Sequence, residues 1–180
     1  SYTAGSVYIN KLYNLFKDDA NMSVEFLGTR GTSPCNHEGR SGWRAYEYVN
    51  LATGEFGELV DNPFYNSATS TFDFSYYMTQ QSYDSVDYVC INLGTNDISR
   101  SHHATTADMI TAYNQMITSI RGYNSNIKIF IGLPGSRALG DMSNKDLIDT
   151  ALSATKALIN EYDNRENEGI YLMPYYLNLD

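Results

Sequence analysis

The tetrapeptide Gly94-Thr95-Asn96-Asp97 combines residue types that can stabilise a developing negative charge. It follows the apolar run 86–93, which predicts that a buried strand opens into a loop at Gly94. Acyl transfer requires rigid hydrogen-bond donors aimed at the tetrahedral oxyanion, and an Asn amide held at a strand end donates one without adding charge. The same residue types are common in turns, so this stretch by itself leaves a plain turn as the alternative.

Two further segments hold residues suited to the same chemistry. The chain opens with Ser1-Tyr2-Thr3-Ala4-Gly5, and residues 37–44 read His-Glu-Gly-Arg-Ser-Gly-Trp-Arg. Together with the tetrapeptide, these segments resemble in order and spacing the first three sequence blocks of the SGNH hydrolases of the GDSL type. The resemblance implies that Ser1 is the nucleophile. It also implies that the backbone N–H of Gly42 and the side-chain amide of Asn96 donate to the oxyanion.

Other segments are most similar to the carbohydrate-esterase branch of that family. They are residues 38–43, 62–65 and 72–78. The resemblance implies a secreted or extracellular serine esterase that works without a cofactor. Its substrate would be an acetylated polysaccharide or oligosaccharide, such as acetylated xylan, from which it removes small acyl groups.

The match has two departures. In the family a hydrophobic strand and a Gly-Asp pair precede the nucleophile, whereas Ser1 is the first residue here. The family's base lies in an Asp-x-x-His block, and none of His37, His102 and His103 has an Asp three positions earlier. We therefore expect the first strand, and the C-terminal catalytic loop with its His base and orienting Asp, to lie outside residues 1–180.

Two other interpretations stay open. The missing Asp-x-x-His motivates a non-catalytic carbohydrate-binding or structural module on the same scaffold. A further alternative is an N-terminal nucleophile hydrolase, in which the α-amine of Ser1 is its own base. Those enzymes use sandwiched antiparallel sheets, whereas the strand pattern of this chain favours a parallel sheet.

The charged residues beside the proposed donors have expected structural roles. A carboxylate next to an oxyanion donor repels the developing charge unless it points away, so we expect Asp97 to fix its loop by hydrogen bonds. Arg40 and Arg44 flank Gly42 and either anchor that loop or contact a substrate, and we favour anchoring.

Composition bounds the class of protein. A chain of 180 residues suits a single domain, and the formal charge of −9 argues against a nucleic-acid partner, which clustered Lys and Arg would bind. No apolar run approaches the ~20 residues that cross a bilayer, so no membrane partner is expected.

Sixteen tyrosines exceed what a core of this size requires. Five of them lie in segments that the predicted fold places near the site: Tyr46, Tyr48, Tyr65, Tyr76 and Tyr77. Such rings stack on sugar faces and their hydroxyls bond sugar oxygens, although packing at the core boundary explains any single one equally well.

The cysteines and histidines add little chemistry. Cys90 lies in the apolar run 86–93 and is expected to be a small buried hydrophobic residue, whereas Cys35 lies in a predicted loop. A disulfide between them is left open. His102 and His103 are adjacent and have no metal-ligand spacing, so no metal site is expected.

Apolar periodicity predicts alternating helices and strands. Helices are expected over residues 7–18, 43–51, 74–81, 106–122 and 143–162, and strands over residues 23–27, 86–93, 127–133 and 170–173. Residues 52–70 read as a long insertion without regular structure.

This alternation indicates an α/β fold with a parallel sheet and right-handed crossovers. With the family resemblance, it predicts one SGNH hydrolase-like domain over residues 1–180, a flavodoxin-like three-layer α/β/α arrangement around a central parallel sheet. Sites in such sheets form at the carboxyl ends of the strands. Ser1, Gly42 and Asn96 are therefore expected to converge on one rim.

Overall fold

The computed structural model describes residues 7–99, 105–134 and 145–174. The chain divides into two compact units. The first comprises Ser1–Trp43 and Phe56–Leu59, and the second comprises Arg44–Glu55 and Val60–Asp180. That residues 1–180 form one domain stays a prediction.

The first unit contains a helix and a hairpin. Helix α1 spans Val7–Lys17, and strands β1 (Arg30–Thr32) and β2 (Cys35–His37) pair antiparallel. The amphipathic pattern predicted the helix correctly, and its ring of Phe16 packs against Phe26 with the centroids 6.5 Å apart.

The strand predicted over residues 23–27 is wrong. Only Phe26 forms a ladder pair, an isolated parallel bridge to Cys35. The next turn lies against the hairpin so closely that a Cβ on Gly28 would sit 2.3 Å from the carbonyl oxygen of His37. The segment therefore packs on the local hairpin and is not a strand of the parallel sheet.

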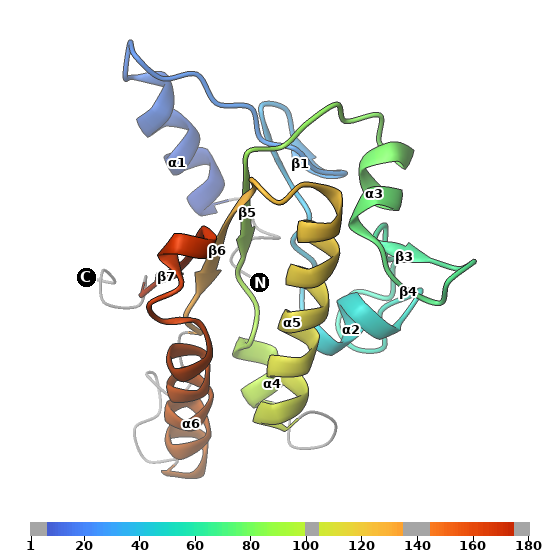
Figure 1. Cartoon of the computed structure of the whole chain (residues 1–180), viewed down its shortest axis with the longest axis vertical. Coiled ribbons are helices and arrows are strands. Elements are labelled where there is room, and N and C mark those ends of the chain that lie inside the picture. The colour runs from blue at the N-terminus through green and yellow to red at the C-terminus, as the bar shows by residue number, and fades with distance from the viewer. Residues whose placement is uncertain (1–6, 100–104, 135–144, 175–180) are drawn as a thin grey trace. The chain divides into compact units, whose positions relative to one another are not determined.

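The second unit is built on a parallel sheet of three strands in the order β5-β6-β7 (Figure 1). These strands are Tyr88–Ile91, Lys128–Gly132 and Ile170–Met173. Helix α5 (Thr106–Tyr123) connects the first two, and helix α6 (Lys145–Tyr162) with the short 3-10 helix η2 (Glu166–Glu168) connects the last two. The mixed α/β class and the parallel sheet are confirmed.

Both crossover helices belong to one face of this sheet. Strands that follow one another in chain order with right-handed crossovers place their helices on the same side. The side chains of Ile129, Ile131 and Ile170 are at most 1% exposed. On the opposite face, Tyr88 is 60% exposed and Cys90 is also exposed. The expectation that Cys90 is a small buried residue is wrong among the described residues, because an apolar run does not show which face of a strand is exposed. That a second layer covers this face, as in a three-layer fold, stays a prediction.

The remaining elements of the second unit are short. Helices α2 (Ala45–Asn50), α3 (Phe74–Gln80) and α4 (Thr95–Ser99) accompany a hairpin of β3 (Tyr65–Asn66) and β4 (Thr71–Phe72). Strand β3 falls within the insertion expected to lack regular structure, because a two-residue strand has no alternation to detect. No helix of the described residues is both long and apolar enough to span a bilayer.

Candidate functional site

The tetrapeptide 94–97 lies just past the carboxyl end of β5. The structure corrects the predicted loop, because Thr95–Ser99 form the single turn of α4. Gly94 precedes this turn with φ +96°, a conformation that favours glycine, and a Cβ there would lie 3.2 Å from Cβ of Pro134. Asn96 is half-buried in the turn. Asn96, the predicted oxyanion donor, thus lies on a helical turn after the end of β5.

Asp97 joins this turn to a distant segment of the second unit. Its side chain is buried, and both carboxylate oxygens accept from the backbone N–H of Ala45, at 3.0 and 3.1 Å. Burial raises the pKa of Asp97 to about 6, although backbone hydrogen bonds and the charge of Arg44 act in the opposite direction. Asp97 therefore fixes its loop by hydrogen bonds, as expected from the sequence, and its partner is the first residue of α2.

Arg44, directly before α2, is buried and forms ion pairs with two carboxylates, of which Glu47 is buried and Glu55 is 48% exposed. Its Nε lies 3.2 Å from Oε2 of Glu47, and its Nη2 lies 2.9 Å from Oε2 of Glu55. Glu47 also accepts from the backbone N–H groups of Arg44 and Glu55, at 2.8 and 2.9 Å. The side chains of Arg44 and Glu47 are fully buried. Arg44 anchors the start of α2. That it also anchors the Gly42 loop stays a prediction.

The Gly42 loop belongs to the first unit and has its own anchors. Gly42 has φ +81°. Arg40 is buried and donates from Nη1 to the carbonyl oxygen and to Oε2 of Glu38, each at 2.9 Å, so it too anchors the loop. Its guanidinium carbon lies 5.1 Å from the centre of the Trp43 ring.

Residues 56–59 complete this loop, a role that the sequence did not indicate. The backbone N–H of Glu58 donates to the carbonyl oxygen of Ser41 at 3.0 Å. The carbonyl oxygen of Glu58 accepts from Nε1 of Trp43 at 2.8 Å. Both contacts cross about fifteen residues of chain, and no local pattern predicts such pairs.

His37 is the one histidine within the described residues. It is buried, and its Nδ1 accepts from the backbone N–H of Gly39 at 3.0 Å. Burial and the charge of Arg30 lower its pKa, so the imidazole is neutral at pH 7. His37 thus supports the turn that leads toward Gly42. His102 and His103 lie outside the described residues.

The three predicted site residues lie in different parts of the chain. Ser1 lies outside the described residues, Gly42 belongs to the first unit, and Asn96 belongs to the second. Their convergence on one rim stays a prediction.

Both cysteines, Cys35 and Cys90, carry free thiols, so the disulfide left open by the sequence is not formed.

The tyrosines expected near the site divide into two groups. Tyr48 and Tyr77 are buried, and the ring centre of Tyr77 lies 4.2 Å from that of Phe64, so both belong to the core. Tyr46, Tyr65 and Tyr76 are half-buried. Core packing accounts for the first pair, and sugar stacking stays a prediction for the other three.

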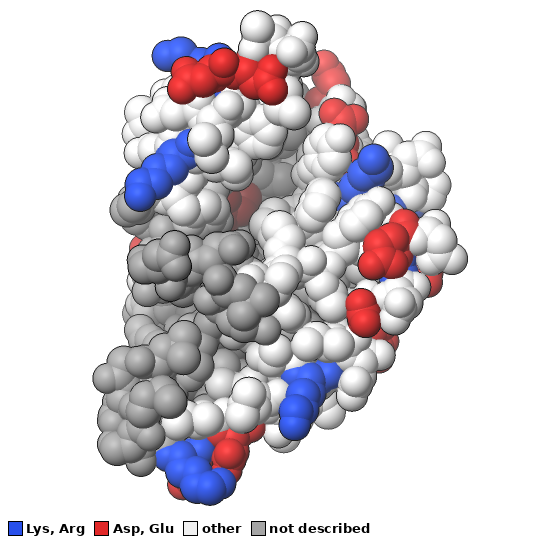
Figure 2. All heavy atoms as spheres, turned by 90° about the vertical axis from the view of Figure 1, so that its left-hand side faces the viewer, with Lys and Arg blue, Asp and Glu red and all other residues white. Residues whose placement is uncertain are grey.

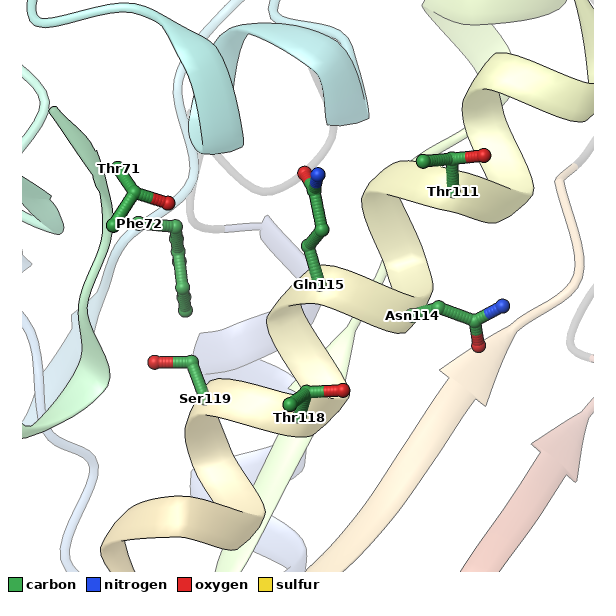
Figure 3. A pocket seen from close by; sticks show the side chains of 7 residues that line it. All are labelled: Thr71, Phe72, Thr111, Asn114, Gln115, Thr118 and Ser119. Carbon is green, nitrogen blue, oxygen red and sulfur yellow. The ribbon is translucent and has the colours of Figure 1, made fainter.

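A shallow groove with a volume of about 480 Å³ lies between β4 and α5 (Figure 3). Its lining is uncharged and consists of Thr71, Phe72, Thr111, Asn114, Gln115, Thr118 and Ser119. Oγ of Ser119 accepts from the backbone N–H of Phe74 at 2.9 Å, and Oδ1 of Asn114 accepts from the hydroxyl of Tyr162 at 2.9 Å. Asn96 is not among the residues that line this groove.

Charged side chains are scattered on the surface that Figure 2 shows. Among the described residues in that view, the Lys and Arg side chains lie apart and form no continuous basic patch. No group of three or more His, Cys, Asp or Glu side chains placed to hold a metal ion occurs in the described part of the chain.

Comparisons of the chain with protein-family models, with curated proteins and with solved structures gave no match.

Proposed function

We propose that the chain is a serine esterase of the SGNH hydrolase type that removes acetyl groups from a polysaccharide or oligosaccharide. The observation that carries the proposal is the position of Asn96. It lies at the carboxyl end of a parallel strand, on a turn held by the buried carboxylate of Asp97. Side chains at this end of a parallel strand are placed to meet a ligand.

The proposed reaction assigns one role to each predicted residue. The hydroxyl of Ser1 attacks the ester carbonyl, and a His base takes its proton. The backbone N–H of Gly42 and the side-chain amide of Asn96 donate to the tetrahedral oxyanion. The sugar hydroxyl leaves with the proton from that His, and water then hydrolyses the acetyl-serine to release acetate.

The proposal includes the three-layer α/β/α arrangement. Its support is the sheet itself, in which both crossovers pack on one face. The other face carries a row of rings, with Phe130 5.1 Å from Tyr171 and 6.0 Å from Tyr88 between ring centres. Such a row of rings is suited to burial under a further layer of helix.

The decisive experiment is mutation in the natural full-length polypeptide. Ser1→Ala is expected to abolish turnover of p-nitrophenyl acetate and acetate release from acetylated xylan. Asn96→Ala is expected to lower kcat on the order of 10² to 10³-fold, the typical effect of one lost oxyanion donor. Ser75→Ala, an exposed serine on α3, is the control and should leave kcat unchanged.

The same assay separates the alternative function. Full turnover by the Ser1→Ala variant would overturn the esterase proposal. Binding of an acetylated xylo-oligosaccharide in calorimetry, with no acetate released by the wild type, would instead support a non-catalytic carbohydrate-binding module.

A further inference from the structure

We propose that Asp97 is a positioning residue of the esterase, which acts through Asn96 by holding the α4 turn against the first residue of α2. This inference rests on the proposed function. It goes beyond that function by assigning the orientation of one oxyanion donor to a specific contact, the paired hydrogen bonds from the backbone N–H of Ala45 to both oxygens of Asp97.

The first step is that this contact joins two residues that are far apart in sequence. Ala45 and Asp97 are 52 residues apart, and Asn96 directly precedes Asp97 on the same helical turn. A turn of five residues has little internal hydrogen bonding, so contacts outside it must define its orientation. Any rotation of α4 that moves the Asn96 amide must stretch or break the bonds to Ala45.

The second step is that the other end of the contact is itself fixed. Ala45 follows Arg44, whose guanidinium is bound by the carboxylates of Glu47 and Glu55. The backbone N–H of Leu51 donates to the carbonyl oxygen of Glu47 at 3.2 Å, and this bond completes the short helix. The first turn of α2 is therefore a rigid base for the Asp97 contact.

The third step is the sensitivity of oxyanion stabilisation to geometry. Donors act only when they are aimed at the position of the oxyanion, and a displacement of ~1 Å can cost about 10²-fold in rate. The Asn96 amide therefore keeps its aim only while the hydrogen bonds between Asp97 and Ala45 hold the α4 turn in place.

The variant Asp97→Asn tests this role. Asn retains the size of the side chain and one acceptor oxygen, but it replaces the other acceptor with an NH₂ donor that faces a backbone N–H. We expect kcat for p-nitrophenyl acetate to fall about 10²-fold with KM changed less than about twofold. The matched control is Asp73→Asn, because Asp73 also accepts from a backbone N–H, that of Tyr76, at the start of α3. It should leave kcat unchanged.

A double-mutant cycle distinguishes positioning from a general structural role. If Asp97 acts through Asn96, the variant Asn96→Ala/Asp97→Asn should have the same kcat as Asn96→Ala alone. Multiplicative losses in the double variant would overturn the inference. So would full kcat in a folded Asp97→Asn variant, and either result leaves the esterase function intact. An inactive wild type would overturn the esterase proposal and this inference together.

Folding of the variants is checked independently of activity. Amide hydrogen exchange at Ala45, measured by NMR, should be faster in Asp97→Asn than in the wild type, while the amides of α5 keep their protection. If Asp97→Asn does not fold, Asp97→Glu provides the second test. It keeps the charge but lengthens the side chain, and a kcat equal to that of the wild type would contradict the need for this geometry.

Discussion

The turn that carries Asn96 and the loop that carries Gly42 are each fixed by a buried charged side chain, but in opposite ways. Asp97 accepts from a backbone N–H 52 residues away, whereas Arg40 donates to Glu38, two residues away. The long-range contact has the larger desolvation cost: burial disfavours the ionised carboxylate of Asp97 and so raises its pKa. Water partly screens the local pair of Arg40 and Glu38, since the Glu38 side chain remains 14% exposed. The buried charge of Asp97, whose hydrogen-bond donor is distant in sequence, is therefore more sensitive to substitution than the charge of Arg40.

The two arginines give the largest expected difference. Arg44→Ala would leave the fully buried Glu47 without its cation, and we expect a loss of ~3–5 kcal/mol in the free energy of unfolding. Arg40→Ala removes hydrogen bonds to a carboxylate that water can reach, so the loss should be ~1–2 kcal/mol. Urea unfolding of both variants measures the difference. Equal losses would show that burial of the partner carboxylate does not set the cost.

Two glycines extend the comparison of the Gly42 loop and the Asn96 turn to backbone packing. Gly57 (φ +74°) would place a Cβ 2.1 Å from the carbonyl oxygen of Ser41, so backbone must move in Gly57→Ala. At Gly94 (φ +96°) the nearest neighbours are side-chain atoms, Cβ of Pro134 at 3.2 Å and Sδ of Met109 at 3.4 Å. We expect Gly94→Ala to cost ~1–2 kcal/mol and Gly57→Ala ~3 kcal/mol, measured by thermal unfolding. A smaller loss for Gly57→Ala would contradict the tighter packing of the Gly42 loop.

The regular elements of the fold were predictable where a periodic pattern extends over enough residues. Helix α5 has its apolar stripe and begins after Thr105, whose hydroxyl accepts from the backbone N–H of Asp108 as a helix cap. Strands β6 and β7 were predictable from their short apolar runs, each of which comes after a helix. The hairpins were missed because strands of two or three residues are too short for alternation to appear.

The site was predictable only in its residue types. The sequence placed Asn96 at a strand end and indicated that Asp97 forms hydrogen bonds, but Ala45 as the partner depends on long-range packing. The same limit applies to the contact between Ser41 and Glu58, and to the exposure of Cys90. Each of these depends on which distant segment lies opposite, and local periodicity carries no such information.

The smallest expected effect is a pH dependence that separates Asp97 from Arg40, because only the carboxyl titrates between pH 5 and 7.5. The pKa of Asp97 is about 6 in the folded chain, above its ordinary value of 3.8, so the folded state binds more protons than the unfolded state in this range. Stability from this group must therefore fall as the pH rises, by ~1.4 kcal/mol between pH 5 and 7.5. Urea unfolding at the two pH values should show this loss in the wild type relative to Asp97→Asn, a comparison in which the opposite contribution of His37 cancels. A wild-type stability that instead increases relative to Asp97→Asn would mean that the contact with Ala45, together with the charge of Arg44, stabilises the ionised carboxylate more than burial penalises it.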